Sequence, residues 1–545
     1  MTQSKQHISL IPQMLAQKGI SNIIISPGSR NAPLIQVLYH QLKQQCISLV
    51  DERSAAYFAL GTALRTRKPA TIVSTSGTAA LNYGPAIAEA FHQGVPLIAL
   101  TADRPREWID MQDNQTIRQN NSFADNCKAT YELPVEAHTS DETWYVNRIL
   151  NEAYNEAISG KPGPVHINIP LREPLYESIP DTETFRNIDY AETKGFTPQD
   201  ELIKTWFSAK RIVIIAGQEL PDERLNETLT SLTNQDQRVA VFAEPISNLA
   251  GDHIISRPDL FIARYKKEMD EFHPDLIISF GGQVVSKRLK TFIRNLNQIN
   301  HWHISPDGKH IDTFRQLTTV IKAVPADFFE AIGTFTKEST LSEYAGQLQG
   351  LNKSLINELT SLTANLPYSD LMAFKQLSRS LKKEDILFAG NSSVIRYIQL
   401  YQLACDEIYA NRGTSGIDGC LSTAAGIAYS TNKKVIAIIG DLSFIYDSNS
   451  LWNRNLPSNL KIVVINNQGG GIFSLIAGPR EQEAFKDLIE AHHPVNIAAL
   501  ASAFGLEHFQ VDKIDQLETT YQTFYQTSGC SILEVKTPAE ANANV

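Results

Sequence analysis

The chain has 545 residues and a mass of 60.6 kDa, and it is 42% hydrophobic and 20% charged, as globular proteins are. At about 150 residues per domain, this length predicts three or four domains rather than a single hydrophobic core. Its 49 Lys and Arg against 59 Asp and Glu give a formal charge of −10, which argues against a general nucleic-acid binder and against an electrostatic membrane anchor.

Short runs of β-branched residues alternate with helical patterns along the whole chain, which predicts parallel sheets covered by helices. In the first third, the predicted strands are Asn22–Ser26, Ile47–Val50, Thr71–Thr75, Pro96–Thr101 and Val165–Ile169. The predicted helices are Asn31–Leu42, Arg53–Leu64, Ala79–Phe91 and Glu142–Ala157. A polar stretch without periodicity, Leu171–Asp200, is predicted to be a linker.

The same alternation restarts twice. In the middle of the chain the predicted strands are Arg211–Ala216, Val239–Phe242, Leu276–Phe280 and His301–Ile304, followed by a polar helical connector, Thr340–Leu362. In the last third they are Asp385–Ala389, Glu407–Tyr409, Val435–Ile439, Lys461–Asn466 and Cys530–Val535. We therefore predict an α/β protein of three doubly wound parallel-sheet domains, at 1–180, 195–335 and 355–545. A weak likeness between the first and last thirds hints that their folds are related.

The sequence also bears on location. Its longest apolar runs are strand-sized, far below the ~20 residues of a membrane-spanning helix. Met1–Gln17 lacks the apolar core and cleavage site of a secretory signal. The five cysteines are widely spaced, without a CxxC pair, which is typical of reduced thiols. We expect a cytoplasmic protein.

Two loops of the last third predict a cation site. One strand leads into Gly440-Asp441-Leu442-Ser443, and the next leads into Asn466-Asn467-Gln468-Gly469. A carboxylate, an amide oxygen and a glycine carbonyl on adjacent loops are ligands for a hard cation such as Mg²⁺, which leaves its other positions to water and phosphate oxygens. A helix-capping Asp and an Asn-Gly turn would explain each half alone. Their pairing across consecutive strands favours metal-diphosphate binding.

Other strand ends carry further candidates. Glu52 lies where a strand passes into a helix, and the turn Thr75–Ala80 offers free amides to an anion or cofactor. Alone, Glu52 is better explained as a first-turn residue that supports its own helix, and the turn is equally well explained as ordinary capping by Ser or Thr. Several loops carry basic and polar residues, which suggests recognition of carboxylates, although each Arg alone is better explained as a surface ion pair. His301 and His303 are interpreted as packing residues, because no third metal ligand accompanies them.

Together, Gly440-Asp441, Asn466-Asn467 and Glu52 resemble the thiamine-diphosphate-dependent decarboxylase superfamily. Within it, five segments resemble the branch that serves menaquinone biosynthesis: Ser26–Arg30, Thr75–Ala79, Thr101–Pro105, Asn411–Gly419 and Gly440–Ser443. The motifs extend from residue 26 to residue 474, and the middle third contributes only Lys287-Arg288. Leu442 replaces the glycine that is usual in the superfamily, but GDLS is the form expected of this branch.

The resemblance implies a fold and a cofactor. Residues 1–180 would bind the pyrimidine of thiamine diphosphate, 195–335 would form a central domain without a retained cofactor, and 355–545 would bind the diphosphate. The cofactor would lie between two chains, so we expect a homodimer at minimum and a homotetramer as the assembly. Mg²⁺ or Mn²⁺ would be held by Asp441, Asn467 and the Gly469 carbonyl. The implied cofactor-binding residues are Glu52, Thr78, Ser415, Gly416, Ile417, Gly440, Asp441, Leu442, Ser443, Asn467 and Gly469.

The resemblance also implies a reaction. It is the decarboxylation of 2-oxoglutarate and 1,4-addition of the resulting carbanion equivalent of succinic semialdehyde to isochorismate, by a transferase of the transketolase type. The products are 2-succinyl-5-enolpyruvyl-6-hydroxy-3-cyclohexene-1-carboxylate and CO₂. The implied catalytic residues are Glu52, Ser29, Arg30, Gln115 and Ser392. The implied substrate-binding residues are Arg30, Arg104, Asn114, Gln115, Lys287, Arg288, Ser392, Arg396, Arg412, Ile472 and Phe473.

Two alternatives stay open. One is another thiamine-diphosphate enzyme, an acetohydroxyacid synthase or a 2-oxoacid decarboxylase, although so many Arg and Lys groups exceed what a small acid needs. The other is a non-catalytic paralogue that binds a ligand, which the presence of Glu52, Asp441 and Asn467 disfavours. A nicotinamide-dependent enzyme would need a GxGxxG loop, which we do not find after any predicted strand.

Overall fold

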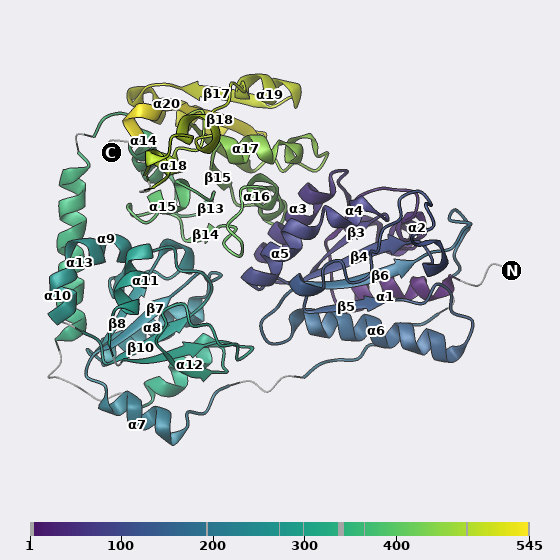
Figure 1. The fold of residues 1–545 in the computed structure, drawn as a ribbon, viewed down its shortest axis with the longest axis horizontal. Helices are drawn as coiled ribbons and strands as arrows, with labels where there is room; N and C mark the ends of the chain where they lie inside the picture. Colours follow the sequence, from purple (N-terminus) through teal and green to yellow (C-terminus); the bar gives the residue numbers. More distant parts are fainter. Residues whose placement is uncertain are drawn as a thin grey trace.

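The computed structural model describes residues 5–181, 183–191, 195–271, 273–297, 299–335, 343–364, 366–475 and 478–542. The chain forms three bodies, each built on a six-stranded sheet with helices on its faces (Figure 1). Every strand pair in the three sheets is parallel. The predicted fold class is therefore confirmed.

The first body has the strand order β2-β1-β3-β4-β6-β5. Its strands are β1 Ile23–Ile25, β2 Cys46–Ser48, β3 Ala70–Ser74, β4 Leu97–Asp103, β5 Ala129–Glu132 and β6 Val165–Pro170. Its helices are α1 Leu10–Gln17, α2 Ala32–Leu42, α3 Glu52–Thr66, α4 Thr78–Leu81, α5 Gly84–Gln93 and α6 Ser140–Ile158. The chain passes from β1 to β2 on one side of β1 and then crosses to β3 on the other side. The loops that follow β1 and β3 therefore run in opposite directions. In open parallel sheets, ligands bind in the crevice between two such loops.

The second body has the strand order β12-β11-β10-β7-β8-β9. Its strands are β7 Ile212–Ala216, β8 Val239–Ala243, β9 Ile254–Ile255, β10 Leu276–Phe280, β11 Asn300–Ile304 and β12 Leu317–Ile321. Its helices are α7 Asp200–Ser208, α8 Glu223–Gln235, α9 Pro258–Arg264, α10 Lys266–Glu271, α11 Lys287–Arg294 and α12 Pro325–Gly333. Helix α13, Tyr344–Leu362, then leads to the third body. It corresponds to the predicted helical connector Thr340–Leu362, of which residues 340–342 lie outside the described residues.

The third body has the strand order β14-β13-β15-β16-β18-β17, the same pattern as the first. Its strands are β13 Ile386–Ala389, β14 Glu407–Tyr409, β15 Val435–Gly440, β16 Leu460–Asn466, β17 Glu507–Val511 and β18 Ser531–Lys536. Its helices are α14 Asp370–Ser380, α15 Val394–Tyr397, α16 Cys420–Tyr429, α17 Asp441–Tyr446, α18 Ile472–Leu475, α19 Ile497–Ala503, α20 Ile514–Gln526 and α21 Ala539–Asn542. The likeness of the first and last thirds is thus a shared strand order.

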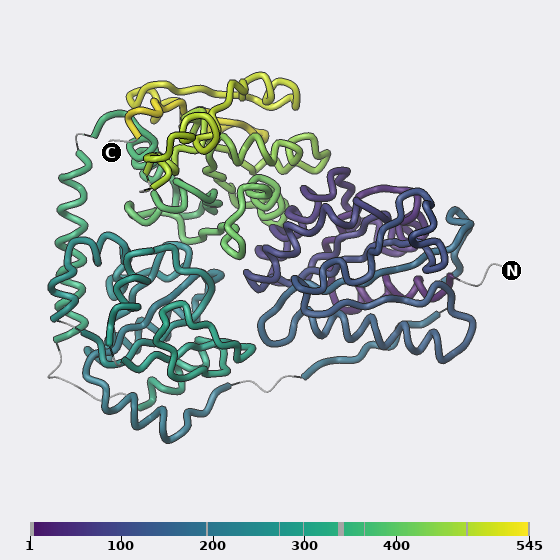
Figure 2. The backbone as a smooth tube through the Cα atoms, in the orientation of Figure 1, coloured from purple at the N-terminus to yellow at the C-terminus, as the bar shows by residue number. Residues whose placement is uncertain are grey.

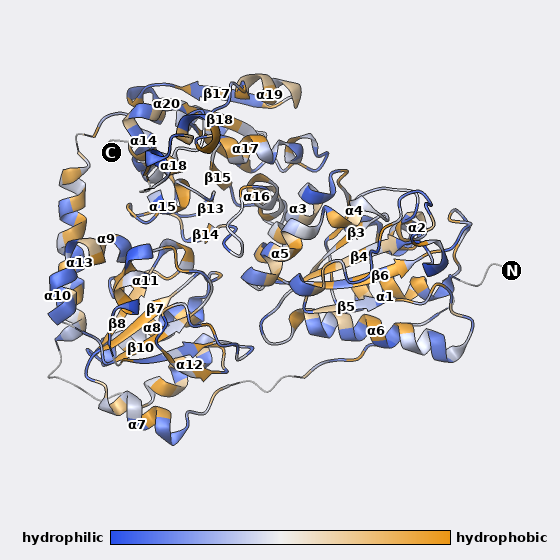
Figure 3. Ribbon diagram, viewed as in Figure 1, coloured by the Kyte–Doolittle hydropathy of each residue, from blue (hydrophilic) through white to orange (hydrophobic). Residues whose placement is uncertain are grey.

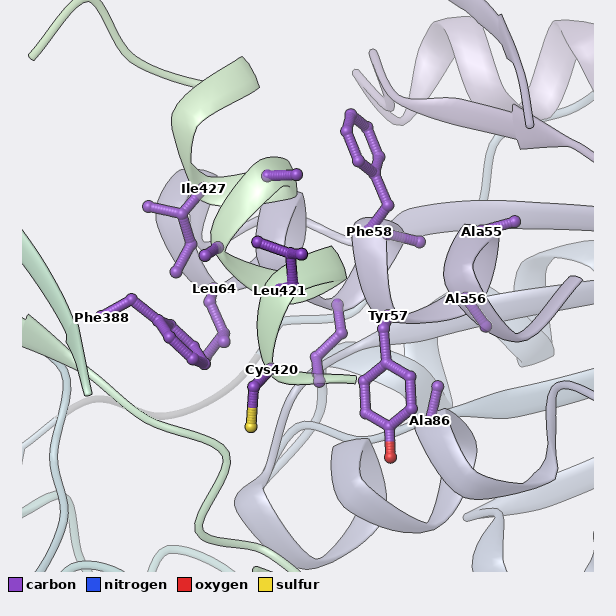
Figure 4. Close-up of a cluster of buried hydrophobic side chains, with 14 of the residues drawn as sticks. Ala55, Ala56, Tyr57, Phe58, Leu64, Ala86, Phe388, Cys420, Leu421 and Ile427 are labelled. Carbon is purple, nitrogen blue, oxygen red and sulfur yellow. The ribbon is translucent and has the colours of Figure 1, made fainter. Parts of the chain in front are cut away.

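The first and third bodies share one hydrophobic core, centred on the crossing of α3 and α16. Figure 4 shows side chains of both helices, among them Leu64 and Leu421, in that cluster. Small residues let the backbones approach: a Cβ on Gly61 would lie 2.1 Å from the Thr423 oxygen, and one on Gly426 would lie 2.0 Å from the Phe58 oxygen. Such close packing fixes the two bodies against each other.

The strands are largely apolar and the outward helix faces polar, as Figure 3 shows. The described part of the predicted linker, from 171 to 199 without 182 and 192–194, contains no helix or strand and carries the chain from the first body to the second (Figure 2). No helix among the described residues is long and apolar enough to cross a membrane.

Two details differ from the sequence predictions. The predicted helix Ala79–Phe91 is two helices, α4 and α5, which break at Asn82–Tyr83 just before Pro85. Strands β5, β9, β12 and β17 were not predicted, and all four lie at the edge of their sheet. Edge strands need no continuous apolar run, which explains the omission.

Candidate active site

The two predicted cation-binding loops lie side by side. Strands β15 and β16 are hydrogen-bonded neighbours, with Gly440 in register with Ile465. Asp441 is the first residue of α17, directly after β15, and Asn467 follows the last residue of β16. The carboxyl ends of adjacent parallel strands thus bring the two side chains to one edge of the sheet.

Asp441 is buried, with 2% of its surface exposed, and its carboxylate is held by backbone amides. Its Oδ1 accepts from Leu442 N at 2.7 Å, and its Oδ2 accepts from Gly469 N at 3.0 Å. His493 Nε2 lies 3.2 Å from Oδ2. Burial raises the pKa of Asp441, while these amides and His493 oppose the rise. The amides fix both oxygens and leave lone pairs for a cation.

Asn467 supplies an oxygen with no donor. Its Oδ1 is buried and accepts no hydrogen bond from the described residues, whereas its Nδ2 donates to Asp370 Oδ2 at 2.7 Å. A buried oxygen left unpaired costs about 1–3 kcal/mol, so it fits a ligand atom. The Gly469 carbonyl, the third predicted ligand, accepts from Gly471 N at 3.0 Å and keeps a second lone pair.

This donor set fits a hard cation held together with a diphosphate. It contains one carboxylate, one amide oxygen and one backbone carbonyl, which leaves room for phosphate oxygens and water. In the described part of the chain, no three His, Cys, Asp or Glu side chains gather as a metal site would need. A metal here therefore depends on the mixed set around Asp441 rather than on an all-protein cage.

The loop 411–419 connects to these residues. Ser443 Oγ donates to the Ile417 carbonyl at 3.1 Å, and Asn391 Nδ2 donates to the Gly416 carbonyl at 2.7 Å. Ser415 has a positive φ of 66° and donates through Oγ to Gln283 Oε1 at 3.2 Å. Leu442 and Ser443 lie in the first turn of α17. The structure thus brings the predicted cofactor residues of the third body into one connected group.

The first body holds this loop. Glu89 of α5 is fully buried, and its carboxylate accepts from Gly413 N at 2.6 Å, Thr414 N at 2.6 Å and Thr414 Oγ1 at 2.7 Å. Tyr57 donates through its hydroxyl to Asp418 Oδ2 at 2.9 Å. Both contacts join α3 or α5 to the loop that carries Ile417. The first body therefore sets the position of a loop that belongs to the third.

We predict that Glu89→Gln loosens this loop. The substitution places an amide group against backbone N–H donors, so one donor stays unpaired at a cost of about 1–3 kcal/mol. We expect a lower Tm and faster amide hydrogen exchange within 411–419. Gln93→Ala is a matched control, because Gln93 also lies on α5 and donates a 3.4 Å hydrogen bond to the carbonyl of Ala410, the residue just before this loop. Equal effects of the two substitutions would contradict the role of Glu89.

Glu52 begins α3, just after the end of β2. Asp51 caps this helix by accepting from Ser54 N at 2.8 Å, as the strand-to-helix pattern predicts. Glu52 is half-buried, and burial raises its pKa, with a smaller contribution from the neighbouring Asp51 charge. In the turn after β3, Gly77 has a φ of 79° and Thr78 is exposed at the start of α4. These segments share one edge of the first sheet.

Within one chain, the segment that carries Glu52 contacts the end of α17 opposite to Asp441. The start of α3 meets the far end of α17: Arg53 Nη2 donates to the Tyr446 carbonyl at 2.9 Å, and Asn449 Nδ2 donates to Asp51 Oδ2 at 2.6 Å. A cavity of about 350 Å³ lies there, lined in part by Pro27, Asp51 and Trp452. No hydrogen bond or ion pair among the described residues joins Glu52 to the cation loops. Among the described residues of one chain, the two halves of the predicted site are thus joined through the far end of α17 and not through the cation loops.

The basic residues of the first body form one group. Arg30 is buried, donates through Nη1 to the Leu171 carbonyl at 3.0 Å and pairs through Nη2 with Glu173 at 3.1 Å. Arg104 pairs with Asp113 at 2.8 Å and donates to the Asn114 carbonyl at 2.7 Å. Ser29, Asn114 and Gln115 are exposed beside them, and Gln115 has a φ of 53°.

The other basic residues lie where the second and third bodies meet. Arg412 donates to Asn391 Oδ1 at 2.8 Å and to Gln283 Oε1 at 3.0 Å. Arg396 is exposed. Burial lowers the pKa of Arg412, and the nearby charge of Arg396 lowers it further. Arg288 pairs with Asp259 at 2.5 Å at the start of α11, and Lys287 beside it is exposed. Ser392 has a φ of 73°, Ile472 is buried and Phe473 is half-buried.

Glu244 holds the segment before α11, and its contribution to stability should depend on pH. Its buried carboxylate accepts from Val285 N and Ser286 N, both at 2.6 Å, and burial raises its pKa from 4.5 to about 7. The folded chain thus binds this proton more tightly than the unfolded chain. The contribution of Glu244 to stability falls as pH rises from about 4.5 to about 7, by about 3 kcal/mol.

Glu244→Gln removes this titration. We expect wild type to lose stability relative to the variant between pH 5 and pH 8, although the variant is less stable at pH 5 because one acceptor oxygen is lost. Urea unfolding at four pH values across this range measures the difference. Parallel stability curves for the two proteins would contradict the raised pKa of Glu244.

Sequence reasoning missed several residues that position the site, namely Glu89, Glu173, Glu244, Gln283, Asp370 and His493. Each acts on a partner distant in sequence, as Glu89 does on Gly413 across 324 residues. The only local signal was the pair Ser369-Asp370 before a helix, which indicates capping and nothing more.

Three family models match the chain in succession. Residues 8–123 match the N-terminal TPP binding domain of thiamine pyrophosphate enzymes, 179–389 match the middle domain of thiamine pyrophosphate enzymes, and 389–535 match the C-terminal TPP binding domain. The two TPP binding matches fall on the bodies that carry Glu52 and Asp441. The middle match extends beyond the predicted central domain, whose limits stay a prediction.

Curated relatives resemble the chain over nearly its whole length. A protein of Desulfotalea psychrophila is 40% identical, with 93% of each chain covered. Relatives from Flavobacterium johnsoniae and Bacteroides fragilis are 38% and 37% identical, covering 98% and 100% of this chain and 96% and 98% of their own. All three are named 2-succinyl-5-enolpyruvyl-6-hydroxy-3-cyclohexene-1-carboxylate synthase. The chain is a thiamine diphosphate enzyme and belongs to the family of these synthases.

Proposed function

We propose that the protein condenses 2-oxoglutarate with isochorismate, releasing CO₂ and forming 2-succinyl-5-enolpyruvyl-6-hydroxy-3-cyclohexene-1-carboxylate for menaquinone biosynthesis. The product is the one in the relatives' name. The observation that carries the chemistry is the buried, unpaired Oδ1 of Asn467 on the loop beside Asp441. Such an oxygen is what a cation-diphosphate site requires.

The chain's own residues would hold the cofactor from two sides. Asp441, Asn467 and the Gly469 carbonyl would hold Mg²⁺ or Mn²⁺ on the diphosphate, and Ile417 would support the bent cofactor between its rings. Bound thiamine diphosphate would supply the electron sink for decarboxylation. Glu52 would hydrogen-bond the aminopyrimidine ring, and burial raises its pKa, which favours the protonated form of a carboxyl that exchanges a proton with the cofactor.

A second chain would complete the site. Within one chain Glu52 meets the far end of α17, so the cation loops that face it would come from a partner. The exposed apolar residues at this edge, Val50 and Trp452, are 54% and 47% exposed and would be covered by that partner. We propose a homodimer at minimum, a homotetramer as the assembly, and a cytoplasmic location.

The substrates would be bound by the two basic groups. Ser392, Arg396 and Arg412 would contact the group derived from 2-oxoglutarate. Arg104, Asn114, Gln115 and Lys287 would contact isochorismate, with Ser29, Arg30 and Arg288 beside them and Ile472 and Phe473 as apolar walls. Both substrates are dicarboxylates, which guanidinium groups bind with paired hydrogen bonds. Because Arg30, Arg104 and Arg288 already pair with acids, their free donors would orient a carboxylate rather than supply its whole countercharge.

One assay tests this proposal against its rivals. The purified protein is given thiamine diphosphate, Mg²⁺, 2-oxoglutarate and isochorismate, and the loss of isochorismate absorbance is followed. We expect turnover only when all four are present. Turnover of pyruvate without turnover of this pair would favour an acetohydroxyacid synthase or a 2-oxoacid decarboxylase. Cofactor binding without turnover of any 2-oxoacid would favour the ligand-binding paralogue.

A further inference from the structure

Asp370 lies behind the proposed cation ligand Asn467. It is the first residue of α14, and 1% of its surface is exposed. Its Oδ2 accepts from Asn467 Nδ2 at 2.7 Å, across 97 residues of sequence. This is the one hydrogen bond that the Asn467 side chain makes among the described residues. Asp370 therefore decides which end of the amide points away from it.

The carboxylate of Asp370 is itself fixed. Thr537 donates through Oγ1 to Oδ1, and the Asp370 backbone N donates to Asn542 Oδ1 at 2.7 Å. These partners come from the segment after β18 and from α21, both outside the cation loops. A carboxylate accepts hydrogen bonds and donates none when ionised, so only the NH₂ end of the Asn467 amide can face it. The oxygen end is left for the cation.

We propose that Asp370 is a positioning residue that orients the Asn467 amide, so that Oδ1 is presented to the divalent cation of the diphosphate. The inference rests on the proposed function, because it takes Asn467 as a metal ligand. Groups that orient metal ligands typically change metal affinity about 10- to 100-fold when they are removed. Without Asp370, the Asn467 amide can turn its NH₂ group towards the cation. That group carries partial positive charge, so the cation repels it.

Asp370 also has a purely structural reading. An acidic residue in the first turn of a helix stabilises that helix, and the contacts with Thr537 and Asn542 tie α14 to the end of the chain. Loss of these ties would lower stability without changing metal affinity. Asn542→Ala is the matched control, because it removes a tie between α21 and Asp370 but keeps the Asp370 carboxylate that accepts from Asn467.

The test measures Mn²⁺ affinity by electron paramagnetic resonance at saturating thiamine diphosphate, and the Tm of each protein without cofactor or metal. We expect Asp370→Ala to raise the Kd for Mn²⁺ at least about tenfold. Asp370→Asn should restore most of the affinity, because its carbonyl oxygen can accept from Asn467. Asn542→Ala should lower the Tm and leave the Kd within about twofold of wild type.

Two outcomes would overturn the inference. The first is an unchanged Kd for Mn²⁺ in Asp370→Ala, whatever its Tm. If that variant does not fold, Asp370→Ser is measured instead and judged by the same criterion. Serine keeps a polar residue in the first turn but is too short to reach Asn467. The second is a Kd raised equally by Asp370→Ala and Asn542→Ala, which would trace the effect to the fold. Asp441→Ala separates these from failure of the proposed function: if it also leaves the Kd unchanged, the cation site itself is misplaced.

Discussion

Glu52→Gln is expected to remove nearly all turnover while leaving the fold intact. The amide keeps the volume of the carboxyl group but cannot exchange a proton with the cofactor, and general acid–base groups contribute about 10²- to 10⁴-fold to rates. Because Glu52 is half-buried and burial raises its pKa, the neutral amide should also be tolerated without loss of stability. We therefore expect kcat to fall by at least about 100-fold at an unchanged Tm. Steady-state kinetics with 2-oxoglutarate and isochorismate, together with thermal unfolding, check both parts.

Asp51→Ala is the matched control for this prediction. Asp51 precedes Glu52, caps α3 through Ser54 N and accepts from Asn449, so its removal costs about 1 kcal/mol or more of stability. We expect Asp51→Ala to lower the Tm with a far smaller loss of kcat. Near-normal turnover in Glu52→Gln, or an equal loss of kcat in both variants, would refute a proton-transfer role for Glu52.

The order of strands and loops was largely predictable from sequence because central parallel strands are buried on both faces. Such strands appear as continuous runs of mainly apolar residues, and β10 begins and ends where its run does. The loops that follow them carry the polar residues, so the position of Asp441 after β15 and of Asn467 after β16 follows from the alternation alone. Since the strands are parallel, the side chains that follow them meet at one edge.

What the sequence could not show was how distant segments fix one another. The carboxylate of Glu89 lies in the middle of a helix, and nothing nearby indicates that it holds residues Gly413 and Thr414. The same applies to Asp370, whose partners Asn467 and Thr537 are brought to it only by the completed third sheet. Polar side chains inside a fold need partners, but sequence does not specify which ones.

The basic residues show a second limit. The resemblance assigns all of them to substrate binding, and within one chain Arg30 lies near Arg104 while Arg396 lies near Arg412. Three of the predicted substrate-binding arginines pair with acids of the chain itself. A formal charge of −10 is thus compatible with the proposed anionic ligands, because acidic neighbours hold these guanidinium groups in place and leave donors that a carboxylate would share.

Asp441→Ala is expected to weaken cofactor binding in a way that added metal restores. The variant loses a carboxylate ligand and the partner of Gly469 N, but it keeps the Asn467 oxygen and the Gly469 carbonyl, so a cation still binds with lower affinity. Titration of thiamine diphosphate at several Mg²⁺ concentrations, followed by tryptophan fluorescence, should show an apparent Kd at least about tenfold higher than wild type at low Mg²⁺. The difference in apparent Kd between Asp441→Ala and wild type should narrow as the Mg²⁺ concentration rises.

Ser443→Ala is the control for local damage near Asp441. It removes the bond to the Ile417 carbonyl from the same turn of α17 but touches none of the proposed cation ligands. Its apparent Kd should depend on Mg²⁺ as that of wild type does, because only the contact of the loop 411–419 is lost. If the apparent Kd of Asp441→Ala depended on Mg²⁺ as that of wild type does, the cation would have to be held elsewhere. The Asp441 carboxylate is the one formally charged ligand of the proposed set, so its loss must alter the Mg²⁺ requirement.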